Sequence, residues 1–179
     1  MKEVMIDIET LSTKNNAVIL TIGAIKFDRK DDIKDIKDME KFYYRVEIES
    51  CKKVGMDIDQ DTLKWWESQD EDAKFEALLN EDRKPIKIVL AKLSIFLRGV
   101  QYFWANSPNF DFIILENAYR VCNLLVPWKF WSLRDCRTVY DLANTKLSSI
   151  GETKHNSLDD CYNQILCLRK SLKKIRLIK

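Results

Sequence analysis

Histidine is nearly absent from this sequence. Its 179 residues include one, His155, beside 30 lysines and arginines and 28 aspartates and glutamates. The sequence also has no C-x-x-C pair, and its five cysteines are an odd number. These features favour reduced thiols in an intracellular protein over a framework of disulfide bonds.

Long uncharged runs are absent as well. No stretch approaches the ~20 apolar residues that a membrane-spanning helix needs. Only a three-residue apolar run follows Lys2 and Glu3 near the start, which is too short for a targeting segment. No internal repeat or low-complexity linker is present. We therefore expect a soluble, cytoplasmic protein with no membrane partner.

The sequence does contain enough apolar residues for a core. Its 46% apolar and 11% aromatic content predicts a single globular domain over residues 1–179. Charge is unevenly spread, since residues 57–82 hold ten acids and two lysines, whereas residues 169–179 hold six basic residues and no acid. This basic tail fits either contact with a phosphate backbone or a solvated helix end, whose lysines suit the helix dipole.

The first half of the sequence has the patterns of β-strands. Apolar residues recur at every second position of residues 4–8, which predicts a strand. Residues 17–28 and 42–48 predict two more strands, separated by a charged loop. Because no helix separates these three strands, they predict an antiparallel meander.

Helical spacing dominates the rest of the sequence. Residues 61–69 and 71–79 predict short helices, the first with Asp61 or Thr62 as its N-cap. Residues 85–99 predict a longer helix, which begins near a proline and ends at a glycine. Strands at 100–105 and 130–133 then alternate with helices that begin at Ser107, Asp135 and Ser157. This order predicts an α/β fold, with a mixed sheet flanked by helices.

Two acids lie on the first predicted strand. Asp7 and Glu9 are two residues apart, so their side chains project from the same face with Cα atoms ~6.5 Å apart. A strand so rich in valine and isoleucine is expected at the centre of the sheet, where two acids need neutralisation. Divalent cations with oxygen ligands would neutralise them. The alternative is a strand that simply ends in solvent.

Two later acids follow strand or loop segments. Asp111 lies in the first turn of a predicted helix, where it either stabilises the helix dipole or supplies a further ligand. Ser157 is a natural N-cap for the last predicted helix, and Asp160 lies three residues after it, which fits a capping box as well as a metal ligand. Periodicity alone does not distinguish Asp159 from Asp160, and a solitary His155 is compatible with an ordinary surface residue.

The combination of these motifs resembles the DEDDh family of 3′–5′ exonucleases, whose fold is ribonuclease H-like. The motifs are "DIET" at residues 7–10, "NFDFIIL" at residues 109–115 and "HNSLDD" at residues 155–160. The histidine of the family's last motif lies five residues before its aspartate, which selects Asp160. "WWESQ" at residues 65–69 and "RDCRT" at residues 134–138 add a likeness to the subgroup that contains phage exonuclease A and small 3′–5′ exoribonucleases.

This resemblance implies a mechanism in which two Mg²⁺ or Mn²⁺ ions hydrolyse phosphodiesters. Asp7 would contact both ions, Glu9 and Asp160 would hold the ion on the nucleophile side, and Asp111 would complete the site. His155 would be the general base, since an unperturbed histidine has a pKa of ~6.5. The implied partner is DNA or RNA with a free 3′ end, and the exoribonuclease likeness implies a homodimer.

The terminal nucleotide is expected to contact Thr10, Leu11 and Phe110, although the last two also fit an ordinary core. Of the adjacent tryptophans at positions 65 and 66, we expect one to stack on a base and one to pack, and we favour Trp66 for stacking. Arg137 either contacts phosphate or pairs with an acid.

Three other functions fit parts of the sequence. Asp57, Asp59 and Asp61 match the start of an EF-hand loop, but the required glycine and glutamate are missing, so we reject this interpretation. A non-catalytic nucleic-acid-binding relative of the same fold and an Mg²⁺-dependent endonuclease remain alternatives to the exonuclease.

Overall fold

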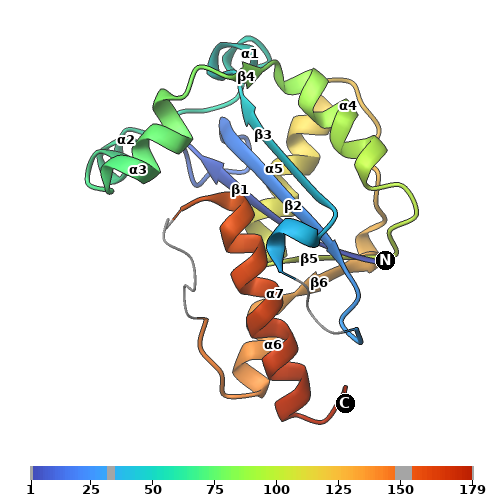
Figure 1. The fold of residues 1–179 in the computed structure, drawn as a ribbon. Helices are drawn as coiled ribbons and strands as arrows, with labels where there is room; N and C mark the ends of the chain where they lie inside the picture. Colours follow the sequence, from blue (N-terminus) through green and yellow to red (C-terminus); the bar gives the residue numbers. More distant parts are fainter. Residues whose placement is uncertain (1, 32–34, 148–154, 179) are drawn as a thin grey trace.

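A six-stranded mixed sheet forms the centre of the protein in the computed structural model, which describes residues 2–31, 35–147 and 155–178 (Figure 1). The strand order is β4-β3-β2-β1-β5-β6. Strands β1 (Glu3–Thr10), β2 (Ile19–Phe27) and β3 (Lys41–Val46) pair antiparallel. Strands β5 (Tyr102–Ala105) and β6 (Leu133–Asp135) are added in parallel beside β1. The predicted mixed sheet is confirmed.

One strand and one α-helix of the first half were not predicted. Strand β4 (Arg83–Lys84) has only two residues and pairs parallel to the end of β3. Helix α1 (Ile48–Lys53) begins at the last residue that we assigned to the third strand. Both elements are too short to produce a periodic pattern, so their conformation depends on neighbouring elements.

The remaining helical segments follow the predicted order, except that the strand predicted at residues 130–133 was wrong in position: a short helical turn occupies its first three residues, and the strand begins only at Leu133. The helical segments are α2 (Gln60–Glu67), α3 (Glu71–Lys74), η2 (Phe75–Leu79), α4 (Ile86–Phe96), α5 (Pro108–Val121), η3 (Phe130–Ser132), α6 (Cys136–Leu142) and α7 (Ser157–Lys174), with a further short turn η1 (Ile36–Asp38) before β3. None of the helices within the described residues is long and apolar enough to cross a membrane.

Two predicted helix caps were wrong. Asp59, rather than Asp61 or Thr62, caps α2 and accepts a hydrogen bond from the backbone N–H of Thr62 over 3.2 Å. Asn156, rather than Ser157, caps α7. Aspartate, asparagine, serine and threonine are all good N-cap residues, so where several stand together the sequence alone does not select one.

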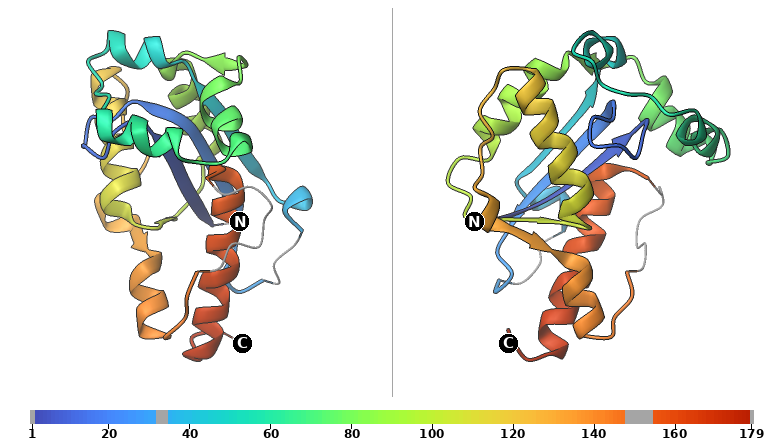
Figure 2. Two further views of the ribbon diagram at one scale, coloured as in Figure 1. Left: turned by 90° about the vertical axis from the view of Figure 1, so that its left-hand side faces the viewer. Right: turned by 180° about the vertical axis from the view of Figure 1, so that it is seen from behind.

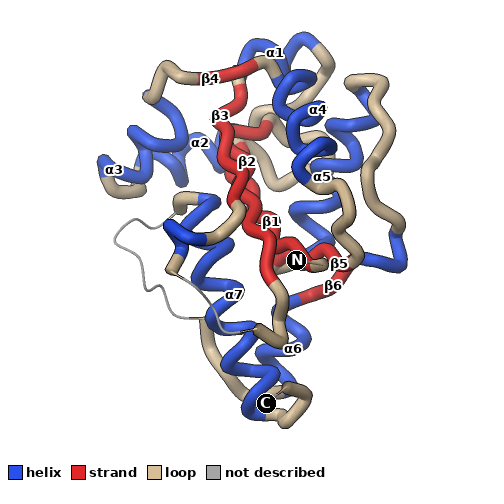
Figure 3. The backbone as a smooth tube through the Cα atoms, turned by 45° about the vertical axis from the view of Figure 1, so that its right-hand side comes forward, coloured by secondary structure: helices blue, strands red, loops and turns tan. Residues whose placement is uncertain are grey.

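The helices form one layer on each face of the sheet. Figure 3 shows α4 and α5 on one side of the strands and α7 on the other. Helices α6 and α7 lie side by side in both views of Figure 2 and extend past the edge of the sheet. The protein therefore has three layers, with β1 in the middle one.

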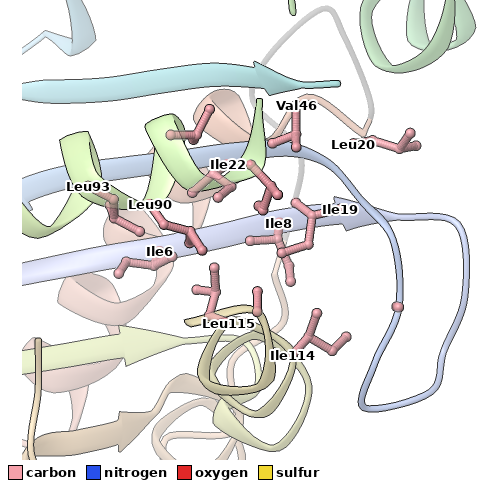
Figure 4. Packing of buried hydrophobic residues seen from close by; sticks show 14 of the residues in the cluster. Ile6, Ile8, Ile19, Leu20, Ile22, Val46, Leu90, Leu93, Ile114 and Leu115 are labelled. Atoms are coloured by element: carbon pink, nitrogen blue, oxygen red, sulfur yellow. The ribbon is translucent and has the colours of Figure 1, made fainter. Parts of the chain in front are cut away.

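The side chains of β1 alternate between the two layers of helices. Ile6 and Ile8 pack with Leu90 of α4 and Leu115 of α5 in a large apolar cluster (Figure 4). Met5 belongs to a second cluster, on the side of α6 and α7. Because side chains along a strand alternate, Asp7 and Glu9 share the face of Met5.

Candidate active site

The first two site acids lie on a central strand, as predicted. Asp7 and Glu9 face α7 from β1, which pairs with β2 on one side and β5 on the other. Burial raises the pKa of both carboxyls well above their usual range, and the charges of Asp111 and Asp160 add to the shift. Burying ionised carboxyls costs free energy, so a buried apolar strand rarely carries two acids.

Asp111 reaches this site from the first turn of α5. Its side chain is 3% exposed, and the backbone N–H of Ile8 donates a hydrogen bond to its Oδ1 over 3.2 Å. Burial raises the pKa of Asp111 to about 7, although this bond and the charge of Arg137 oppose the shift. Arg137 is exposed at the start of α6, and its positive charge lowers the pKa of Asp111.

Asp160 and His155 come from the start of α7. A ring nitrogen of His155, a carboxylate oxygen of Asp160 and a carboxylate oxygen of Glu9 all lie within 4.8 Å of one another. Burial, followed by the charge of Asp159, raises the pKa of Asp160 to about 6. His155 precedes the helix with a φ of 62°, and its ring lies against Trp65 at a centroid distance of 4.8 Å.

A glycine on β2 lets α7 approach the sheet closely. Gly23 pairs directly with Asp7 across the strands. A Cβ atom added to Gly23 would lie only 2.4 Å from the carbonyl oxygen of Ser157, in the first turn of α7. The hydroxyl of Ser157, which is fully buried, lies 3.0 Å from that of Thr21. The missing side chain therefore brings the start of α7, with Asp160, to the acids of β1.

The donor chemistry of the site fits divalent cations. Four carboxyls meet here from β1, α5 and α7. Burial raises the pKa of each, and the charges of neighbouring acids raise some of these values further. A divalent cation would relieve both the repulsion and the desolvation, and carboxylate oxygens are the ligands that Mg²⁺ and Mn²⁺ prefer. The residues expected to hold metal thus fit that role.

A hollow of about 530 Å³ lies beside the acids. Its lining includes Glu9 and Thr10 from β1, Trp65 from α2 and Phe110 from α5. Phe110 is half-buried, and the threonine is almost fully buried. Leu11 is 2% exposed and belongs to the large apolar cluster, so its side chain serves the core in this structure.

The preference for Trp66 as the exposed ring is corrected by the structure. Trp66 is 1% exposed, and its indole N–H donates to the carbonyl of Thr10 over 2.9 Å, which fastens α2 to the end of β1. Trp65 is 42% exposed and lines the hollow. Adjacent residues of a helix face different directions, but only the packing of α2 decides which one is buried.

Two residues near the site were missed at the level of sequence. Gly23 lies among β-branched residues, and a glycine within a strand often marks a close approach of backbone. Gln164 donates a hydrogen bond from Nε2 to Oδ1 of Asp7 over 2.8 Å. It lies four residues after Asp160, hence on the same face of the helix, which is a signal that the sequence contained.

The chain matches a known family over most of its length. A family model described as "3'-5' exoribonuclease Rv2179c-like domain" matches residues 2–172. An exodeoxyribonuclease of Enterobacteria phage T4 is 22% identical over 205 aligned positions, which cover 97% of this chain and 90% of that protein.

Solved structures of nucleases share the fold. Cell-death related nuclease 4 (CRN-4) has a TM-score of 0.59 at 13% identity, and the match covers 96% of this chain but only 63% of that one. The nuclease domain of 3'hExo, a DEDDh family member solved with bound rAMP, has a TM-score of 0.57 at 12% identity over 96% of this chain and 91% of that one. Pop2p of S. pombe, solved with Mg²⁺ and Mn²⁺, has a TM-score of 0.56 at 11% identity over 96% and 83%.

These likenesses establish the ribonuclease H-like fold of the DEDDh nucleases. Because the family model spans almost the whole sequence, the chain belongs to the Rv2179c-like family of 3′–5′ exoribonuclease domains.

Proposed function

We propose that this protein removes nucleotides from the 3′ end of a nucleic acid by a reaction that depends on two divalent cations. The observation that carries the proposal is that ligand atoms of Glu9, His155 and Asp160 lie within 4.8 Å of one another. Two further acids of the site, Asp7 and Asp111, have raised pKa values. The products would be nucleoside 5′-monophosphates.

Four carboxylates would hold the ions, which we propose to be Mg²⁺ or Mn²⁺. Asp7 would contact both, Glu9 and Asp160 would contact the ion on the nucleophile side, and Asp111 would complete the site. When bound, the ions would lower the pKa of the attacking water and neutralise charge on the phosphate and the leaving oxygen.

His155 would accept the proton of the attacking water. Its ring lies next to Glu9 and Asp160, and the ring of Trp65 packs against it at an interplanar angle of 81°. This contact supports a fixed orientation of the imidazole, which a general base needs within hydrogen-bonding reach of its proton.

The terminal nucleotide would enter the hollow beside the acids. Phe110 and Trp65 supply its aromatic lining, and Thr10 lines it as well. We expect Trp65→Ala to weaken oligonucleotide binding by roughly 5- to 150-fold, because stacking contributes ~1–3 kcal/mol per base. Trp131→Ala is the control, since Trp131 is also exposed but is not among the residues that line this hollow. Equal binding by both variants would contradict stacking on Trp65.

The proposed activity includes both DNA and RNA as substrates. The matching family is described as exoribonucleases, whereas the phage relative is an exodeoxyribonuclease. A protein distinguishes the two polymers through contacts to the 2′-hydroxyl. The homodimer implied by the exoribonuclease likeness is tested separately, by light scattering of the purified protein.

Matched 5′-labelled DNA and RNA oligonucleotides, with free or blocked 3′ ends and with or without Mn²⁺, test the proposal. We expect a ladder that shortens one nucleotide at a time, only with metal and only from free ends. Cuts at internal positions would identify an endonuclease. Tight binding without cleavage would identify a non-catalytic relative, and Asp7→Asn provides the inactive control.

A further inference from the structure

Gln164 is a buried amide that the proposed reaction does not itself use. It lies on α7, one turn after Asp160, and its side chain is 2% exposed. Its Nε2 donates to Oδ1 of Asp7 over 2.8 Å, and this bond lowers the pKa of the carboxyl against the opposing effect of burial. The contact joins residues 157 positions apart in the sequence.

Packing alone does not explain a glutamine at this position. From the same helix, Cys161, Ile165 and Leu168 pack into the apolar cluster on this side of the sheet. The Oε1 of Gln164 is buried and makes no hydrogen bond to any residue that the structure describes. A buried amide with an unpaired oxygen is destabilising relative to an apolar side chain of similar size.

Two of the site acids each accept a hydrogen bond from an N–H donor of a distant residue. Oδ1 of Asp111 accepts from the backbone of Ile8, and Oδ1 of Asp7 accepts from Gln164. A carboxylate held in this way has one oxygen in a fixed position and the other available to a ligand.

We propose that Gln164 is a positioning residue that orients Asp7 for divalent cations. This inference rests on the proposed metal-dependent function. Groups that hydrogen-bond to metal ligands typically contribute 10- to 100-fold to metal affinity, because they orient the ligand before the ion arrives. Gln164 would therefore act on metal affinity through Asp7, without contact to the substrate.

Calorimetric titration of Mn²⁺ into the metal-free protein tests this role. Gln164→Met keeps the length of the side chain and removes the N–H donor, and we expect it to raise the Kd for Mn²⁺ by ~10- to 100-fold. Nuclease activity of this variant should recover toward wild type at saturating Mn²⁺, because the missing contact affects ion binding.

Tyr140→Phe is the matched control. The Tyr140 hydroxyl donates to the backbone carbonyl of Gln164 over 3.0 Å, so this variant also loses a buried hydrogen bond to residue 164 but leaves its amide on Asp7. We expect its Kd for Mn²⁺ to equal that of the wild type, even if both variants unfold at lower temperature. Equal Kd values for Gln164→Met and wild type would overturn this inference and leave the proposed function intact. Failure of the wild type to bind Mn²⁺ would overturn both the inference and the proposed function.

Discussion

The two faces of strand β1 differ completely in chemistry although they share one backbone. On the face toward α4 and α5, Ile6 and Ile8 are buried in a continuous apolar cluster. On the face toward α7, Met5 is followed by Asp7 and Glu9, whose pKa values are raised by burial. The first face stabilises the fold, whereas the second carries carboxylates at a cost to stability that a bound cation would offset.

The first prediction has the largest expected effect and compares substitutions on the two faces of β1. Asp7→Asn should lower kcat by roughly three orders of magnitude or more, because metal-ion catalysis contributes several kcal/mol and each 1.36 kcal/mol is tenfold. Ile6→Ala, one residue away, should cost ~2–5 kcal/mol of unfolding free energy and leave kcat per folded molecule near wild type. Urea denaturation and single-turnover rates measure the two quantities. Similar losses of kcat in both variants would remove the distinction.

The second prediction concerns His155, on the α7 side. His155→Ala should lower kcat by at least ~10²-fold, the contribution typical of a general base, while Mn²⁺ affinity is largely kept. Rate measurements and calorimetry on the same preparation test this. Near-normal turnover would contradict the role of base, and a parallel loss of Mn²⁺ affinity would instead make His155 a metal ligand.

The third prediction tests the close approach of α7 to the sheet. Gly23→Ala places a methyl group against the carbonyl of Ser157, so it should cost ~1–3 kcal/mol of stability. It should also lower kcat by up to ~10²-fold, because a displacement of about 1 Å at a catalytic group has that effect.

Gly99→Ala provides the control for that variant. Gly99 has a φ of +81° with no atom within 4 Å of the added Cβ. Its substitution should cost ~1–2 kcal/mol through backbone strain alone. Because Gly99 follows α4, at the opposite face of the sheet from α7, we expect kcat to be unchanged. An equal loss of kcat in both glycine variants would show that reduced stability alone explains the effect.

The fourth prediction concerns the dependence of stability on pH in the absence of metal. Burial raises the pKa of Asp111 to about 7, whereas an unfolded aspartate titrates near ~3.9. Between these values the folded protein binds more protons than the unfolded chain, so this group's contribution to stability falls as pH rises from ~4 to ~7. Saturating Mg²⁺ should reverse the loss.

Asp111→Asn isolates this contribution. Asparagine does not titrate. In the presence of EDTA, the unfolding free energy of the variant should therefore increase relative to that of the wild type as pH rises through the same window. A constant difference between pH 4 and 7 would contradict a raised pKa in the folded state.

Much of the fold was predictable because long elements produce long patterns. The period of two in β1 and the period of 3.6 in α4 and α7 appear directly in the sequence. Strand β4 has only two residues, so it was missed. The cap of α7 was wrong because Asn156 and Ser157 are both good capping residues, and only backbone geometry separates them.

The candidate site was predictable as a set of motifs but not as an arrangement. Resemblance selected Asp160 over Asp159, and the structure places Asp160 beside Glu9 and His155. The contributions of Gly23 and Gln164 depend on how α7 packs against β1 and β2. The burial of Trp66 depends in the same way on the packing of α2. Such contacts between distant elements leave little trace in local sequence.

The hydrogen bond between Gln164 and Asp7 has a consequence for protein synthesis. It joins the first strand to a helix that the ribosome makes 157 residues later, and contacts of such long sequence separation form late in folding. A growing chain that ends before His155 contains Asp7, Glu9 and Asp111 but neither His155 nor Asp160. The proposed nuclease would therefore remain inactive until α7 has emerged and docked.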